Sequence, residues 1–163
     1  MSNKLNDKGY SELKEKCSSG VFEHYISLGH CCYVALDLEE MGLREASLPF
    51  DWTRSKWKAI ERSYKTHFDG MLEYDSLYQK KNHPVDYKNL EYGIGFFHDF
   101  NQYDSLKSQF KAVQKKYNRR IERFFQFINQ PSLFVRYCLD EEELFYIAAH
   151  YSEIKATLKN ATL

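Results

Sequence analysis

Two adjacent cysteines follow a glycine in the segment Ser27–Cys32, and this segment carries the most informative chemistry of the sequence. A β-branched and aromatic run at Val21–Leu28 predicts a strand, and the apolar rhythm from Tyr33 predicts a helix, so Cys32 should start that helix. The helix dipole is predicted to lower the pKa of such a thiol, and Gly29 would let backbone N–H groups approach an oxyanion. This arrangement is typical of a nucleophile, whereas most free cysteines are buried apolar side chains.

His98 is the preferred general base. It lies beside Asp99 at the predicted end of a short strand at 93–100. A neutral imidazole near its ordinary pKa accepts a thiol proton at pH 7. A structural histidine, hydrogen-bonded at a strand end, is the competing interpretation. His30 is closer to Cys32 in the sequence, but we expect it on the loop, where its ring could point away.

Asp51 and Asp99 compete for the role of orienting the imidazole. Asp51 belongs to a proline-restricted segment, 47–52, which is predicted to be extended and rigid. Asp51 would serve equally well as a cap for a helix that begins near residues 53–55. Neighbouring side chains of a strand point to opposite faces, so Asp99 is poorly placed to orient His98. The sequence therefore slightly favours Asp51.

Several arginines are candidates for substrate binding. Arg119, Arg120 and Arg123 could clamp a carboxylate or phosphate, although the charged outer face of an amphipathic helix is the ordinary explanation. Arg136 is less ordinary because it ends a predicted strand, and the carboxyl ends of strands line ligand crevices in open α/β sheets. The sequence has no C-x-x-C motif and no H-x-x-x-H pair, so we expect no metal and no cofactor.

Composition limits the class of protein and its partners. The chain has 163 residues, of which 43% are hydrophobic and 17% aromatic, so we expect one ordered domain. Its 23 basic residues balance 23 acidic ones, which predicts no nucleic-acid partner. No apolar run approaches the ~20 residues that span a bilayer, and the start of the chain lacks a signal sequence. We therefore expect reduced cysteines, a cytoplasmic location, no membrane partner, and a small-molecule or peptide substrate.

The order of predicted elements favours an α/β fold. Residues 1–20 are predicted to be a polar lead-in, residues 21–163 a single domain, and residues 65–92 irregular structure. Strand–helix units recur, which favours a parallel or mixed sheet covered by helices, with a papain-like α+β fold as the alternative. The sequence ends where another strand is predicted, which suggests a domain shortened at its C-terminus. The remaining predicted elements are helices at 33–42, 55–64, 105–129 and 141–154 and a strand at 133–137.

Six short blocks in this order resemble a bacterial family of unknown function that is labelled a papain-like cysteine peptidase. Together they cover most of the chain from about residue 25 to 150. The blocks are Ser27-Leu28-Gly29-x-x-Cys32-x-x-Ala35, Gly42-Leu43-Arg44, Pro49-Phe50-Asp51-Trp52, Phe97-His98-Asp99-Phe100, Arg119-Arg120-Ile121-x-Arg123-Phe124 and Leu133-Phe134-Val135-Arg136.

The resemblance assigns the family's cysteine position to Cys32, although Cys31 stands beside it where the family usually has one cysteine. It implies a cysteine-dependent hydrolase, either a peptidase, an amidase or an esterase/acyl transferase. In that hypothesis Cys32 attacks, His98 transfers the proton, and Asp51 or Asp99 orients the imidazole. The alternative is a non-catalytic ligand-binding or interaction domain linked to surface-polysaccharide handling, in which the same blocks only hold the fold.

Overall fold

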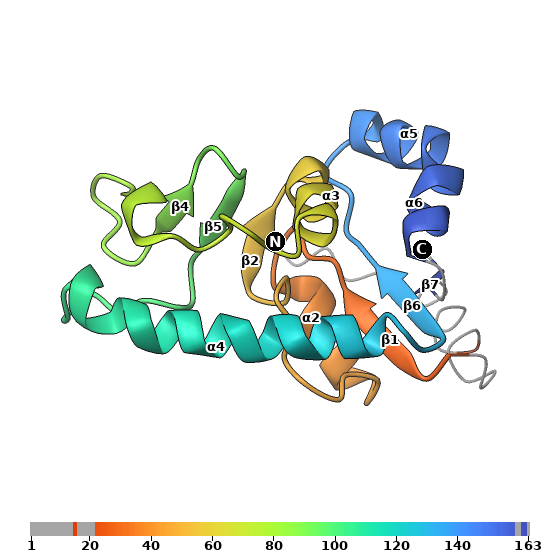
Figure 1. Ribbon diagram of the computed structural model, residues 1–163, viewed down its shortest axis with the longest axis horizontal. Helices are drawn as coiled ribbons and strands as arrows, with labels where there is room; N and C mark the ends of the chain where they lie inside the picture. The colour runs from red at the N-terminus through yellow and green to blue at the C-terminus, as the bar shows by residue number, and fades with distance from the viewer. Residues whose placement is uncertain (1–14, 16–21, 159–160, 163) are drawn as a thin grey trace.

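The structure is a computed structural model that describes residues 15, 22–158 and 161–162 (Figure 1). The predicted lead-in at 1–20 therefore lies almost wholly outside the described residues. The described part is a mixed α/β fold with one parallel and one antiparallel sheet. The parallel sheet has the order β1 (His24–Ser27), β6 (Ser132–Val135), β7 (Ala161–Thr162). The antiparallel sheet has the order β2 (Thr53–Ser55), β5 (Ile94–Phe96), β4 (Tyr87–Asn89), β3 (Leu77–Gln79).

The helices of the described residues are α2 (Tyr33–Glu40), α3 (Trp57–Lys65), α4 (Leu106–Phe127), α5 (Glu141–Ala149) and α6 (Tyr151–Thr157), with a short 3₁₀ turn at Tyr74–Ser76.

The parallel pairing of β1 and β6 confirms the predicted α/β class. Ile26 lies opposite Phe134 in the register, and both side chains are buried. Each of these strands is followed by a helix, α2 after β1 and α5 after β6. A further strand, β7, follows the last helix within the sequence and pairs in parallel with β6, whereas the sequence pattern called for such a strand only at the point where the sequence ends. The carboxyl ends of β1 and β6 therefore lie side by side.

The antiparallel sheet corrects the prediction that residues 65–92 are irregular. This range contains β3 and β4, and β4 pairs with β5. These strands have three residues each, which is too short for apolar alternation to appear in the sequence. Instead, the Asn89 side chain holds the preceding loop by donating to the carbonyl oxygens of Gly70 and Met71.

Helix α4 packs along both sheets and forms much of the core (Figure 1). The Phe110 ring meets Tyr74 beside β3, Tyr117 meets Phe96 of β5, and Phe124 meets Phe134 of β6. The helix starts as predicted, with the Ser105 hydroxyl accepting a hydrogen bond from the Ser108 N–H. The buried face of the helix was predicted to include Phe110, Ile121 and Phe124, and of these Ile121 is only partly buried.

The predicted helix at 141–154 is divided into α5 and α6 at His150. The Nδ1 atom of the His150 ring lies 2.8 Å from the Tyr146 carbonyl oxygen. Leu144 was predicted on the buried side but is exposed, and Ile147 and Ile154 are the buried residues of the two helices. The change of direction at His150 explains why one helical face could not describe both segments.

Candidate functional site

The junction between β1 and α2 brings Cys32 to the edge of the parallel sheet. The chain turns through Gly29, where φ is +69° and an added Cβ would lie 2.8 Å from the Ser55 Oγ and 3.0 Å from the Phe50 carbonyl oxygen. Only glycine fits such a contact without strain. The loop is thus held directly against β2, and Cys32 follows at the N-cap position of α2, half-buried.

His30 lies at the centre of this junction. Its backbone adopts a left-handed conformation with φ of 59°, and its ring faces Tyr137 at a centroid distance of 6.2 Å. Nδ1 is buried and has no hydrogen-bond partner among the described residues. Burial lowers the pKa of His30, and the positive charge of Arg136 lowers it further, against the opposing effect of Glu143. The imidazole is therefore neutral at pH 7.

The expectation that the start of a helix lowers the pKa of Cys32 is wrong. Burial raises the pKa of this thiol, and the neighbouring Cys31 raises it further. A backbone hydrogen bond at Cys32 and the positive charge of Arg54 act in the opposite direction but are smaller. Desolvation disfavours the charged form of any group, and here it outweighs the favourable charges. Cys32 is therefore a neutral thiol at pH 7, two residues along the chain from the neutral imidazole of His30.

This protonation state predicts how Cys32 reacts with iodoacetamide. The alkylation rate should keep rising with pH through pH 9, because the thiol pKa lies above its ordinary value of 9.0 and only the thiolate reacts. Mass spectrometry of the peptide that contains Cys32 measures this rate, with Cys31→Ser removing the adjacent thiol. A rate that levels off at neutral pH would show a preformed thiolate and contradict the prediction.

A buried ion pair lies beneath the site. The Arg136 side chain is 2% exposed, and its guanidinium donates to Glu143 at 2.7 Å, to the Leu28 carbonyl oxygen at 2.6 Å and to the Ser55 carbonyl oxygen at 2.9 Å. Glu143 also accepts the backbone N–H of Trp57 at 2.9 Å and so caps α3 from α5. Arg136 was predicted to bind substrate. The acceptors around it belong to the protein and favour a role in joining β1, β2, α3 and α5.

His98 and Asp99 lie on the stretch that follows β5 and point in different directions. His98 is exposed, and its ring meets Trp52 edge-to-face at 5.8 Å. The Asp99 side chain is 1% exposed and accepts a hydrogen bond from Tyr117 at 2.7 Å, with Lys116 at 2.6 Å. The contacts described for Asp99 thus go to α4.

Asp51 lies in a turn, and the expectation that segment 47–52 is extended is wrong. Its carboxylate accepts the backbone N–H of Leu48 at 2.9 Å and Arg44 Nε at 3.1 Å, which closes the turn. Burial raises the pKa of Asp51, against the lowering effect of the Leu48 N–H and of Arg44. The contacts described for Asp51 join the turn to Arg44, and none of them goes to a histidine.

The arginines of α4 do not form one cluster. Arg119 is exposed, whereas Arg120 is buried 3.7 Å from Asp99 and faces the Tyr117 ring. Arg123 donates to the Ser47 carbonyl oxygen at 2.7 Å and holds the turn that contains Asp51. The three side chains therefore occupy different surroundings, which does not favour a common clamp.

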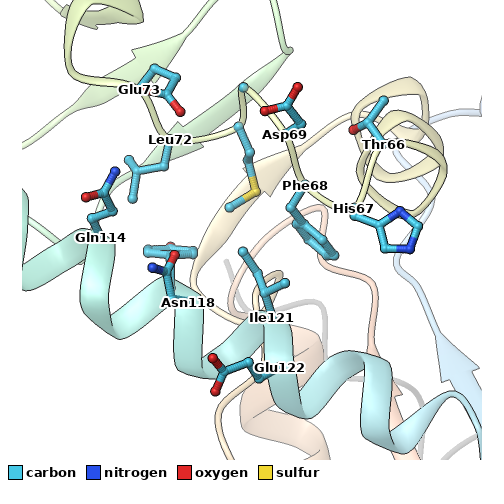
Figure 2. A pocket seen from close by; sticks show the side chains of 13 residues that line it. Thr66, His67, Phe68, Asp69, Leu72, Glu73, Gln114, Asn118, Ile121 and Glu122 are labelled. Carbon is cyan, nitrogen blue, oxygen red and sulfur yellow. The ribbon is translucent and has the colours of Figure 1, made fainter.

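A surface cavity of about 470 Å³ lies between α4 and the loop that follows α3, and no residue of the Cys32 junction lines it. Figure 2 shows the carboxylates of Asp69, Glu73 and Glu122 and the amides of Gln114 and Asn118 among its lining, together with the apolar side chains of Phe68, Leu72 and Ile121. Within the described ranges, no three His, Cys, Asp or Glu residues are arranged to hold a metal ion. Nor does any helix of the described chain have the length and apolar character needed to cross a bilayer.

Sequence reasoning set His30 aside as a loop residue and did not place Glu143 near the Cys32 junction. Glu143 was expected to complete the cap of α5, where the Asp140 side chain does accept the Glu143 N–H at 2.8 Å. Its carboxylate instead reaches Arg136 and Trp57. For His30, the only signal was a histidine directly after a glycine at a strand end, which is weak without the positions of Tyr137 and Arg136.

The fold and the site define a mixed α/β domain with a cysteine where a parallel strand meets a helix. The chain belongs to the family described as "Putative papain-like cysteine peptidase (DUF1796)", whose model matches residues 23–162. Among curated proteins, it is 36% identical over 121 residues to "Uncharacterized protein R408" of Acanthamoeba polyphaga mimivirus. That alignment covers 62% of this chain and 54% of the viral protein, so the chain spans about half the length of this relative. No solved structure matches the chain significantly.

Proposed function

We propose that this protein is a cysteine-dependent hydrolase in which Cys32 is the nucleophile. The observation that carries the proposal is the position of Cys32, half-buried at the N-cap of α2 and two residues from a neutral imidazole. The described contacts include no side-chain cap on this end of α2, so its first-turn N–H groups are free to face a developing oxyanion. The family description supports the same chemistry.

We assign the role of general base to His30. Its buried Nδ1 has no partner in the described part of the chain, so this nitrogen is available to accept the thiol proton. The sequence-based hypothesis instead uses His98 with Asp51 or Asp99. The described contacts of those carboxylates go to Arg44, Leu48 and residues of α4, which favours His30.

The proposed reaction starts from two neutral groups. The Cys32 sulfur attacks the substrate carbonyl carbon while its proton moves to His30, and the carbonyl π electrons move to the oxygen. Collapse of this intermediate breaks the bond to the leaving group, which takes the proton from the imidazolium. Water then attacks the thioester carbon, loses a proton to the same imidazole, and releases the acid together with the Cys32 thiol.

Four variants test this assignment against a panel of chromogenic ester, amide and peptide substrates. Cys32→Ser should abolish hydrolysis, while Cys31→Ser, one residue earlier, should keep most of it. His30→Ala should lower the rate by about 10²–10⁴-fold, as expected for loss of a general base, and His98→Ala should lower it much less. Intact-mass spectrometry should detect the acyl group on Cys32.

Other outcomes would contradict the proposal in separable ways. Hydrolysis that survives Cys32→Ser excludes the nucleophile. A large loss in His98→Ala with little loss in His30→Ala moves the base to His98. A folded protein that hydrolyses no member of the panel and forms no acyl adduct favours the non-catalytic binding domain.

A further inference from the structure

An exposed leucine of α2 lies over the turn that begins at Cys32. The Leu36 N–H donates to the Cys32 carbonyl oxygen at 3.0 Å, so the two residues lie one turn apart on the same face of the helix. Helical side chains tilt toward the N-terminus of their helix, and Leu36 therefore extends over the first turn toward Cys32. Leu36 is 43% exposed. The surface beside the thiol is thus apolar and open to solvent.

An exposed tyrosine lies beside the candidate base. The Tyr137 N–H donates to the Gly29 carbonyl oxygen at 3.4 Å, which fixes the chain after β6 along the loop that leads to Cys32. Arg136 points into the buried ion pair, whereas the Tyr137 ring faces the imidazole of His30, with 6.2 Å between the centroids and 26° between the ring planes. Tyr137 is 44% exposed. We call Leu36 and Tyr137 the apolar pair.

The position of the apolar pair distinguishes it from other exposed apolar side chains. Singly exposed leucines and tyrosines are common on protein surfaces and require no ligand. Here the two side chains come from different segments, and each lies next to one of the two reacting groups. Leu36 shares a helix face with the nucleophile, and the Tyr137 ring faces the base. An apolar group held by both would be removed from water and would exclude water from the reacting groups.

We propose that the Cys32 site takes acyl substrates whose acyl group carries an apolar chain or ring, and that this chain or ring packs against Leu36 and Tyr137. The inference rests on the hydrolase function proposed above and adds the chemical class of its substrate. Burial of one methylene group changes a binding constant by a factor of about four, so a short apolar chain is enough for a measurable preference.

The test compares two neutral alkylating agents that differ by one apolar group, N-benzyliodoacetamide and iodoacetamide, on the full chain carrying Cys31→Ser. The ratio of their rates at Cys32 cancels the thiolate fraction, and division by the same ratio for glutathione corrects for the reactivity of the reagents. The corrected ratio at Cys32 should be about three to ten. Leu36→Gln and Tyr137→Gln should each lower it about two- to four-fold, because each removes apolar surface beside a reacting group.

Leu90→Gln and Tyr103→Gln are the matched controls. Leu90 lies between β4 and β5 of the other sheet, Tyr103 precedes α4, and these residues are 67% and 86% exposed. Both variants should leave the corrected ratio at Cys32 unchanged. A corrected ratio of about one before either substitution in the apolar pair would overturn the inference. A ratio that neither Leu36→Gln nor Tyr137→Gln lowers would do the same, as would a Cys32 that neither reagent reaches.

The result is separable from the outcome of the hydrolysis panel. Within that panel, a chromogenic hexanoate ester should be cleaved with a kcat/KM roughly ten-fold above that of the acetate ester. A labelling ratio that depends on the apolar pair in a protein without hydrolytic activity would keep the apolar site and reject the hydrolase. Hydrolysis that depends on Cys32, together with a ratio that ignores the apolar pair, would keep the hydrolase and reject the apolar preference.

Discussion

Replacing Arg136 by methionine should lower the free energy of unfolding by about 3–5 kcal/mol at pH 7. The substitution leaves Glu143, whose side chain is 10% exposed, without its charged partner. It also removes the donors to the carbonyl oxygens of Leu28 and Ser55, which hold the ends of β1 and β2 together. Urea unfolding followed by circular dichroism measures the loss.

Arg62→Met provides the control for the loss of an arginine as such. Arg62 pairs with Glu91 at 3.8 Å, but these side chains are 41% and 86% exposed. An exposed pair contributes roughly 0–1 kcal/mol, so this variant should remain close to the parent protein. Similar losses in Arg136→Met and Arg62→Met would contradict the role that we give to the buried pair.

The pH dependence of the Arg136→Met effect gives a second readout. Burial acts to raise the pKa of Glu143, but hydrogen bonds and charge from Arg136, with the N–H groups of Trp57 and Leu139, hold it below its ordinary value of 4.5. A depressed carboxyl pKa contributes stability above the unfolded value, and this contribution is lost as pH falls through the folded value. The difference between the parent protein and Arg136→Met should therefore shrink as pH falls below about 4.5.

Phe124→Ala should cost about 3–5 kcal/mol through the cavity that it leaves in the core. The Phe124 side chain is fully buried and its ring lies within 5.9 Å of the ring centroids of Phe50 and Phe68. It also stacks on Phe134 of β6, so the substitution removes a ring contact between α4 and the parallel sheet. A thermal melt should shift downward by roughly 10 °C for a chain of this size.

Phe145→Ala is the matched control, because Phe145 lies on α5 and is 67% exposed. Its melting temperature should stay within a degree or two of the parent value. A shift of only that size in Phe124→Ala would show that the helix face of α4 is assigned wrongly.

Local patterns in the sequence determined the elements that the site needs. The β1–Gly29–α2 order followed from the change of apolar period near Tyr33, and the helix α4 from the apolar rhythm of residues 105–129. The parallel sheet followed from the repeated strand–helix order. These features depend on residues within about one or two turns of each other, so the sequence shows them directly.

Tertiary structure decided which polar side chains meet. Trp57 and Glu143 are 86 positions apart, and Arg136 lies 108 positions from Leu28, yet these contacts join the elements beneath Cys32. The raised pKa of Cys32 and the lowered pKa of His30 both have burial as their largest cause. Burial depends on which distant elements cover a residue, and neither a motif nor a period encodes that. For this reason the sequence located the cysteine, while only the folded chain set the protonation state of its thiol and the surroundings of each candidate histidine.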